Sequence, residues 1–240
     1  MSEAILVQGL TKAYHGKTVV DHLDLSVPHG TVFGLLGANG AGKSTTIECM
    51  LGTKQADAGR VRLLGQDPKQ RRRTLFQRIG VQFQEGDYHP DIRVSELCEE
   101  TASLYSSPAD WRQLYEQFGI GDKRNAAVKD LSGGERQRLF IVLALIPQPE
   151  LVFLDELTTG LDAKARRGVW KTLETLKEQG LTIFLTSHFM DEVEALCDEI
   201  CILKQGVAVF RGTVAQAKEL CGCEHFEDAY LQLSDEEVEK

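Results

Sequence analysis

Two short glycine-rich segments contain residues whose types and spacing could bind phosphate. The first, GANGAGKST, spans residues 37–45 and fits the pattern G-x-x-x-x-G-K-[ST] between an apolar run and a helical one. The second, LSGGERQRL, spans residues 131–139 and places two glycines after a serine, where a helix is expected to begin. Both arrangements can direct backbone N–H groups at an anion. The chain therefore has two candidate phosphate-binding segments, about ninety residues apart.

The first segment predicts a complete phosphate loop. Its glycines let backbone N–H groups surround a polyphosphate without interference from a Cβ atom. The Lys43 ammonium would reach the outer phosphates, in a charge pair worth roughly 4 kcal/mol before desolvation at about 4 Å and an effective dielectric of about 20. The Ser44 hydroxyl is placed to bind Mg²⁺. The residues expected to hold the nucleotide here are Gly37, Ala38, Asn39, Gly40, Ala41, Gly42, Lys43, Ser44 and Thr45.

A pair of acids follows a second apolar run. LVFLDE, residues 151–156, reads as a buried parallel strand that ends in Asp155 and Glu156. Such a strand would place Asp155 at the carboxyl edge of the sheet, opposite the phosphate loop, where it could hold Mg²⁺. Glu156 could orient or deprotonate a water in line with the γ-phosphate, a role typically worth about 10²–10⁴ in rate.

Two more polar residues follow predicted strands. His188 comes after LTIFLTS, and a parallel strand there would bring it to the same edge of the sheet, within reach of the γ-phosphate. Gln84 comes after IGVQF and lies at a third such edge. On its own, a histidine at the end of a strand is usually structural, and Gln84 alone would not indicate a function. Together with the phosphate loop and the acids, His188 is a candidate catalytic residue.

Composition limits the classes of partner. The net charge of −9 argues against nucleic acid as the main partner, because phosphate backbones require a basic face. The basic stretch at residues 69–78 is consistent with either an exposed helix face or a patch near an anionic membrane leaflet. No targeting signal is evident, and the longest apolar run has eight residues, far short of the ~20 that span a bilayer. Any membrane part would therefore belong to another polypeptide.

The six cysteines do not have the spacing of a zinc ribbon or of a small disulfide-rich fold. We expect Cys49, Cys98, Cys197 and Cys201 to be small core residues. Cys221 and Cys223, separated by one glycine, leave two alternatives open: a metal or redox pair, or an ordinary structural role.

The pattern of apolar residues predicts an α/β fold with a mostly parallel sheet. Strands that read as antiparallel begin the chain, and a helical region follows from about residue 94 to 146. Strands and helices then alternate, and a hairpin over residues 199–212 turns at KQG. The strands are expected near residues 4–10, 22–27, 31–36, 61–65, 79–83, 150–156 and 181–188, and the later helices near 164–180 and 190–197.

This set of motifs resembles the ATP-binding cassette family, and specifically the nucleotide-binding subunit of ABC transporters. The resemblance covers residues 4–212 and rests on five elements in the expected order. These are GANGAGKST, the glutamine of VQFQE, LSGGERQR, LVFLDE with GLD after it, and the histidine of LTSH. The resemblance implies a P-loop NTPase core with an antiparallel β subdomain and a helical subdomain.

In this family, the segment that corresponds to LSGGERQR, residues 131–138, is called the signature segment. Two cassettes pair head to tail, and the signature segment of each one caps the ATP that the partner holds. The resemblance therefore implies that Ser132, Gly133 and Gly134 contact a γ-phosphate on the partner, which gives two composite sites per dimer. Glu156 would be the catalytic base and His188 a γ-phosphate contact.

Three further roles follow from matching positions in the family. Tyr14 would stack on adenine, although a surface tyrosine in a turn is the alternative. Gln84 would touch Mg²⁺ and move with a transmembrane partner, and Asp162 would reach across the dimer. The chain departs from the family pattern at Leu157, where proline is usual, at Thr159, where serine is commoner, and at Glu135, where glutamine is common. Leu157 leaves the path of the following loop open, because it lacks the fixed φ of proline.

The expected domain organisation is one ABC ATPase domain over residues 1–233, with a helical subdomain over about 89–148 inserted in it. The acidic residues 234–240 are expected to form a disordered tail. FEDAYLQLS, residues 226–234, resembles the short tails of ABC-2 drug and antibiotic exporters, or is an ordinary C-terminal helix.

The predicted function is an ATPase subunit, with ATP and Mg²⁺ as cofactors, that drives transport, in the direction of export, through a separate integral-membrane permease. Its partners would be a second copy or a homologous cassette and that permease, with no nucleic acid. It would be cytoplasmic and peripheral on the inner face of the membrane. The alternatives are a soluble ATPase of a cofactor-assembly complex and a non-hydrolysing regulatory cassette.

Overall fold

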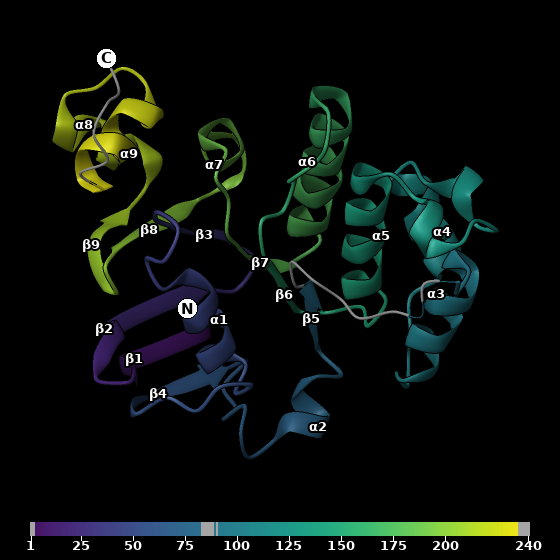
Figure 1. Ribbon diagram of the computed structural model, residues 1–240, viewed down its shortest axis with the longest axis horizontal. Coiled ribbons are helices and arrows are strands. Elements are labelled where there is room, and N and C mark those ends of the chain that lie inside the picture. The colour runs from purple at the N-terminus through teal and green to yellow at the C-terminus, as the bar shows by residue number, and fades with distance from the viewer. Residues whose placement is uncertain (1–2, 83–88, 90, 235–240) are drawn as a thin grey trace.

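The polypeptide forms two sheets, and the smaller one contains the N-terminal strands. The computed structural model describes residues 3–82, 89 and 91–234 of the chain. The smaller sheet is antiparallel, in the order β2-β1-β4, with the bounds β1 Glu3–Tyr14, β2 Lys17–Pro28 and β4 Ala58–Leu63. Figure 1 shows it at the lower left, next to helix α1. The antiparallel N-terminal strands predicted from the sequence are confirmed.

The larger sheet contains the strands that end at the candidate site. Its order is β5-β6-β7-β3-β8-β9, and all neighbours are parallel except the β8–β9 hairpin. Parallel strands end at the same edge, so the segments that follow β3, β6 and β7 lie close together. The bounds are β3 Val32–Leu36, β5 Ile79–Gln82, β6 Leu151–Leu154, β7 Thr182–Leu185, β8 Glu199–Lys204 and β9 Val207–Gly212. The predicted α/β fold with a mostly parallel sheet is confirmed.

Both faces of the larger sheet are covered, which explains the continuous apolar runs of its strands. On β6, Val152 and Leu154 pack into a core with α5 and α6, whereas Leu151 and Phe153 face a second core with α1 and the smaller sheet. Phe153 also contacts the ring of Phe184 on β7, with ring centroids 5.3 Å apart. The covering helices have the bounds α1 Lys43–Met50, α2 Arg72–Leu75, α6 Ala163–Glu178 and α7 Met190–Leu196.

A group of helices lies at one side of the larger sheet, on the right of Figure 1. It contains α3 Val94–Ser103, α4 Trp111–Gln117, two 3₁₀ turns at Gly121–Lys123 and Val128–Asp130, and α5 Gly133–Leu145. Helix α5 approaches β5 so closely that a Cβ atom at Gly80 would overlap the carbonyl oxygen of Ala144. Ala144 lies near the end of α5, so this contact holds the helix against the sheet. The signature segment lies at the other end of the same helix.

The C-terminal part of the chain adds two helices, α8 Val214–Cys221 and α9 Phe226–Ser234, beside β8. Phe226, Ala229 and Tyr230 pack in a small core with Leu36 and Ile202. Residues 226–234 are thus helical, whereas α8 was not predicted from the sequence. The disordered tail was predicted for residues 234–240, but Ser234 is the last residue of α9 and is buried, so the prediction is wrong there. Residues 235–240 lie outside the described residues. Among the residues that are described, no helix is long and apolar enough to cross a membrane.

Candidate functional site

The phosphate loop lies between β3 and α1, as the sequence predicts. Gly37, Gly40 and Gly42 have positive φ angles of 147°, 81° and 106°. A Cβ atom at Gly37 would overlap the carbonyl oxygen of Leu203, and one at Gly42 would overlap that of Val19. Both the backbone conformation and the close approach of neighbouring strands therefore require glycine at these two positions.

Lys43 is the first residue of α1 and is buried, with 7% of its surface exposed. Its Nζ atom donates to the carbonyl oxygens of Gly37 at 2.6 Å and of Ala38 at 3.1 Å. The ammonium thus lies inside the loop. A buried cation beside the N-terminus of a helix is an environment that favours a polyanion. These residues fit the phosphates of a nucleotide.

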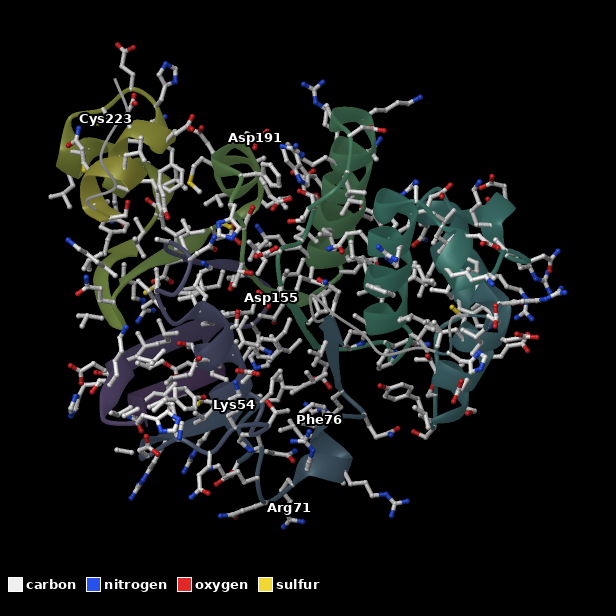
Figure 2. All side chains as sticks on the ribbon, in the orientation of Figure 1. Lys54, Arg71, Phe76, Asp155, Asp191 and Cys223 are labelled. Carbon is white, nitrogen blue, oxygen red and sulfur yellow. The ribbon has the colours of Figure 1, made fainter. Side chains whose placement is uncertain are left out.

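A cavity of about 330 Å³ opens in front of the loop. It is lined by Val19, Asn39, Gly40, Gly42, Lys43, Ser44, Thr45, Asp155 and Glu156. The two acids that follow β6 thus lie opposite the phosphate loop, as predicted. Figure 2 shows Asp155 near the centre of the molecule, between the larger sheet and α1.

A larger cavity of about 560 Å³ lies at the open edge of β4 and contains none of the predicted site residues. It is lined in part by Arg60, Arg62, Lys69 and Arg71, and Figure 2 shows Arg71 at the lower rim, far from Asp155. Charged side chains on an edge strand such as β4 prevent it from pairing with another chain. In the basic stretch 69–78, Arg71, Arg72 and Arg73 are all exposed, which agrees with both predicted alternatives, an exposed helix face and a patch near an anionic membrane leaflet.

Asp155 is buried and accepts a hydrogen bond from the Thr186 hydroxyl at 2.5 Å. Burial raises the pKa of this carboxyl group, the Thr186 hydrogen bond opposes the rise, and the neighbouring Glu156 adds to it. A buried carboxylate next to a second acid is stabilised by a cation. The Asp155 carboxylate and the Ser44 hydroxyl are hard oxygen donors on the same cavity, and this donor set fits Mg²⁺.

Glu156 occupies the left-handed region with a φ of 52°, which is uncommon for a residue with a side chain. Its N–H donates to the Thr186 hydroxyl at 2.9 Å. Its carboxylate is 19% exposed, and Oε1 lies 3.2 Å from Nε2 of His188. Of the three predicted catalytic residues, Lys43, Glu156 and His188, the structure therefore brings the last two into contact. A γ-phosphate contact of His188 remains a prediction.

Leu157 resolves the question of the loop that follows Glu156. Its N–H donates to the carbonyl oxygen of Thr186 at 3.3 Å, and its side chain is fully buried. Proline has no N–H and could not form this hydrogen bond. The leucine thus fixes the path of the loop by a hydrogen bond and by packing instead of by a fixed φ.

The signature segment lies at the start of α5 and away from the nucleotide cavity of its own chain. Ser132 caps the helix: its hydroxyl accepts from the N–H of Glu135 at 3.3 Å, and Glu135 Oε2 accepts from the N–H of Ser132 at 2.9 Å. The Ser132 N–H and the Lys123 ammonium lower the pKa of Glu135 to about 2. Gly133 faces open space, whereas Gly134 packs against Gly160 and Leu161 of the loop before α6.

The structure does not bring the remaining predicted residues into the cavity. Tyr14 ends β1, and its ring lies 5.0 Å from the Lys12 ammonium and 5.7 Å from that of Lys54. Asp162 caps α6 by accepting from the N–H of Ala165 at 2.8 Å, which lowers its pKa. Gln84 lies outside the described residues. Adenine stacking by Tyr14 and a contact of Asp162 across a dimer therefore remain predictions.

The cysteines fall into the two expected groups. Cys49, Cys98 and Cys201 are fully buried and Cys197 is half-buried, in agreement with core roles. Cys221 and Cys223 are half-buried at the end of α8. In the described part of the chain, no group of three or more His, Cys, Asp or Glu side chains could hold a metal ion.

Thr186 is one residue of the site that the sequence analysis missed. It follows β7 and contacts both acids, through Oδ1 of Asp155 and the N–H of Glu156. The available signal was its position two residues before His188, at the end of a strand that neighbours β6.

The sheet order, the phosphate loop and the acids after β6 define a P-loop nucleotide-binding protein of the α/β class. Within that class, the chain belongs to the ABC transporter family, because the sequence model of that family matches residues 20–159. It is accordingly an ATP-binding cassette with ATPase activity.

Two relatives illustrate the family. The chain is 41% identical over 211 residues to Nod factor export ATP-binding protein I from Ralstonia nicotianae, a match that covers 86% of this chain and 66% of the relative. It is 38% identical over 226 residues to the daunorubicin/doxorubicin resistance ATP-binding protein DrrA from Streptomyces peucetius, which covers 92% and 68%. The chain thus spans about two thirds of the length of these relatives.

Solved structures agree with the fold. The structure of an ATP-binding subunit of an ABC transporter superposes with a TM-score of 0.87 at 24% identity and covers 96% of this chain and 99% of that one. A nucleotide-free ATP-binding cassette from an ABC transporter gives a TM-score of 0.82 at 20% identity, with 95% and 99% covered.

Proposed function

We propose that two copies of the chain bind two ATP molecules at composite sites and drive export through a separate membrane permease. The observation that supports this proposal best is the position of the signature turn. Ser132 and Gly133 are exposed and ordered by the capping box, yet they do not line the cavity that contains Lys43 and Glu156. A second copy, or a homologous cassette, could supply the missing side of that cavity. The name of the relative from Ralstonia nicotianae, a Nod factor export protein, supports the direction.

Within each site, the chain would hold the nucleotide through the phosphate loop. Lys43 would exchange its two carbonyl partners for phosphate oxygens, while the N–H groups at the start of α1 point at the β- and γ-phosphates. Ser44 and Asp155 would hold Mg²⁺, which would neutralise phosphate charge when bound. Gln84 is proposed to contact the same ion.

Glu156 would accept a proton from the attacking water, and His188 would orient the carboxylate and contact the γ-phosphate. The Thr186 hydroxyl donates to the Asp155 carboxylate and accepts from the Glu156 N–H, and it thereby holds the two acids in their relative orientation. The chemistry needs this alignment, because a misplacement of about 1 Å can cost about 10²-fold in rate.

The permease would dock where the helical subdomain meets the sheet. We place this subdomain at about residues 89–148, inserted in an ATPase domain over residues 1–233. The docking surface would lie around Gln84–Arg93 and α3, although residues 83–88 and 90 are outside the described part. In this proposal, the chain reaches the inner face of the membrane only through that permease. No nucleic acid takes part.

The Glu156→Gln variant tests this function. The amide cannot accept the proton, so the steady-state release of phosphate should fall about 10²–10⁴-fold. Because ATP remains bound, the variant should also form a dimer in the presence of MgATP, measured by light scattering after gel filtration. Glu178→Gln, an exposed site on α6, is the matched control. If Glu156→Gln hydrolyses ATP near the wild-type rate, the assignment of Glu156 as the catalytic base is wrong. If the wild-type protein is a monomer with full activity at every dilution, the proposal of a composite site is wrong.

A further inference from the structure

Gln137 lies on α5, one turn after the signature glycines, and its side chain contacts the segment that contains Glu156. The Nε2 atom donates to the carbonyl oxygens of Glu156 at 3.1 Å and of Leu157 at 2.8 Å. Only the NH₂ end of this side chain can face two carbonyl oxygens, so the contacts define the orientation of the amide. Helix α5 and the catalytic segment are therefore joined by one side chain with two donors.

The backbone of Glu156 is held from two directions. Its N–H donates to Thr186, which follows β7, and its carbonyl oxygen accepts from Gln137 on α5. A left-handed φ in a residue with a side chain persists where the surroundings hold it in place. A displacement of α5 would pull on the carbonyl side of this residue and change the direction of its carboxylate.

The first turn of α5 makes a second contact with the same segment. A Cβ atom at Gly134 would lie 3.1 Å from the carbonyl oxygen of Gly160 and 3.1 Å from Cδ2 of Leu161, so the helix and the loop are already in close contact there. The first two turns of α5 thus contact the loop after β6 at both of its ends. The same turns present Ser132 and Gly133 at the surface.

We propose that Gln137 is a positioning residue that couples the signature turn of each chain to Glu156 of the same chain. The inference rests on the proposed function, in which that turn caps the nucleotide of the partner. A nucleotide that is capped by one chain then favours the reactive position of that chain's Glu156, which acts on the other nucleotide. The two composite sites are thereby coupled through the interior of each chain.

Gln137→Ala in the full chain tests the coupling. Steady-state hydrolysis over a range of MgATP concentrations gives kcat, KM and the Hill coefficient, and a fluorescent ATP analogue gives the affinity of the phosphate loop. We expect kcat to fall about 10–100-fold, as for other displaced catalytic groups. The Hill coefficient should fall towards one, whereas the affinity for the analogue should change by less than about twofold, because Lys43 and its loop are unaltered. Gln113→Ala, an exposed glutamine on α4, is the control.

Gln137→Glu provides a readout that a general loss of packing would not give. The introduced carboxyl group has nearly the same shape, and next to two carbonyl oxygens its pKa should be raised. When protonated, it can donate one hydrogen bond; when ionised, it repels both oxygens. Its rate relative to wild type should therefore rise as the pH is lowered from 8 to 6, whereas the relative rate of Gln137→Ala should not change over that range.

Two results would overturn the coupling. One is a folded Gln137→Ala protein, verified by circular dichroism, with the kcat and the Hill coefficient of the wild type. The other is a Gln137→Glu protein whose relative rate does not depend on pH. A wild-type protein that hydrolyses ATP without cooperativity, at a rate per chain independent of dilution, would instead refute the proposed dimer, and with it the link between sites. In that case a lower kcat of Gln137→Ala would still identify a residue that positions Glu156 within one chain.

Discussion

The phosphate loop and the signature turn are both glycine-containing starts of helices, but their glycines are needed for different reasons. In the phosphate loop, Gly37 and Gly42 have positive φ and lie against the backbone of Leu203 and Val19, so the fold of the chain requires them. In the signature turn, Gly133 is not among the residues with positive φ and has open space around it. No contact among the described residues requires glycine there.

This difference bears on the proposal that each site is completed by a second chain. The phosphate loop already surrounds a buried cation, next to a cavity with two acids. The signature turn is a capped helix start that faces outward. A missing side chain at an exposed position is useful where another surface must approach closely. The comparison thus favours a surface outside the chain as the ligand of the signature turn.

The largest expected effect is at Lys43, in the complete half of the site. Lys43→Ala removes a buried cation that no neighbour replaces, so ATP hydrolysis should fall about a thousandfold and ATP affinity at least about tenfold. Phosphate release measures the rate of hydrolysis, and titration with a fluorescent ATP analogue measures the affinity. An affinity equal to that of the wild type would contradict the assignment of the loop.

A substitution at Gly37 should destabilise the fold of the chain. In Gly37→Ala, the methyl group overlaps the Leu203 carbonyl in a conformation that favours glycine, at an expected cost of about 3 kcal/mol in the free energy of unfolding. Urea denaturation followed by circular dichroism measures this cost. Gly168→Ala is the control, because Gly168 lies in α6 with nothing within 4 Å, and alanine should be neutral or stabilising there.

Gly133→Ala should impair hydrolysis without loss of stability, whereas Gly37→Ala should lower stability. The free energy of unfolding should stay within about 1 kcal/mol of wild type or rise, because alanine is the better helix former. Hydrolysis should nevertheless fall about 10–100-fold, because the methyl group would occupy the space into which a partner's phosphate must come. If activity survives intact in Gly133→Ala, the comparison between the two turns fails.

The smallest effect concerns the cap of the signature helix. The pKa of Glu135 is about 2 in the folded chain, below its ordinary 4.5, so its stabilising contribution is present above pH 4.5 and is lost as the pH falls from 4.5 to 2. Glu135→Gln should be less stable than wild type by about 1–2 kcal/mol at pH 7, after discounting for partial exposure. The difference in denaturation midpoint between the wild type and Glu135→Gln should become steadily smaller below pH 4.5. If this difference does not depend on pH, the charge of Glu135 is not the cause of the difference in stability.

Much of this site could be predicted from the sequence, because its parts are local patterns. The phosphate loop needs only a strand, glycines at fixed offsets and a helix, and all three occur in order. The strand before Asp155 could be recognised because a parallel strand that is buried on both faces has only apolar residues. The hairpin of β8 and β9 follows from its Gln205–Gly206 turn, in which both residues have positive φ.

The supporting contacts could not be predicted, because they depend on how distant segments approach each other. Thr186 reaches the acids because β7 pairs with β6, and Gln137 reaches Glu156 because α5 lies beside that edge of the sheet. Neither distance is encoded in the residue spacing. Leu157 is a similar case: its use of the backbone N–H became evident only from the neighbouring Thr186 carbonyl oxygen. The helix α8 was missed although the capping box of Thr213 and Gln216 could have indicated its start.

The two carbonyl oxygens that bind Lys43 have a consequence for the end of each reaction cycle. As inorganic phosphate departs, the ammonium can return to the oxygens of Gly37 and Ala38 within the same loop. Product release then does not leave a bare positive charge in a buried place, and the loop can keep its shape between turnovers. Free sulfate or phosphate in the medium must compete with these internal partners, so both should be weak inhibitors.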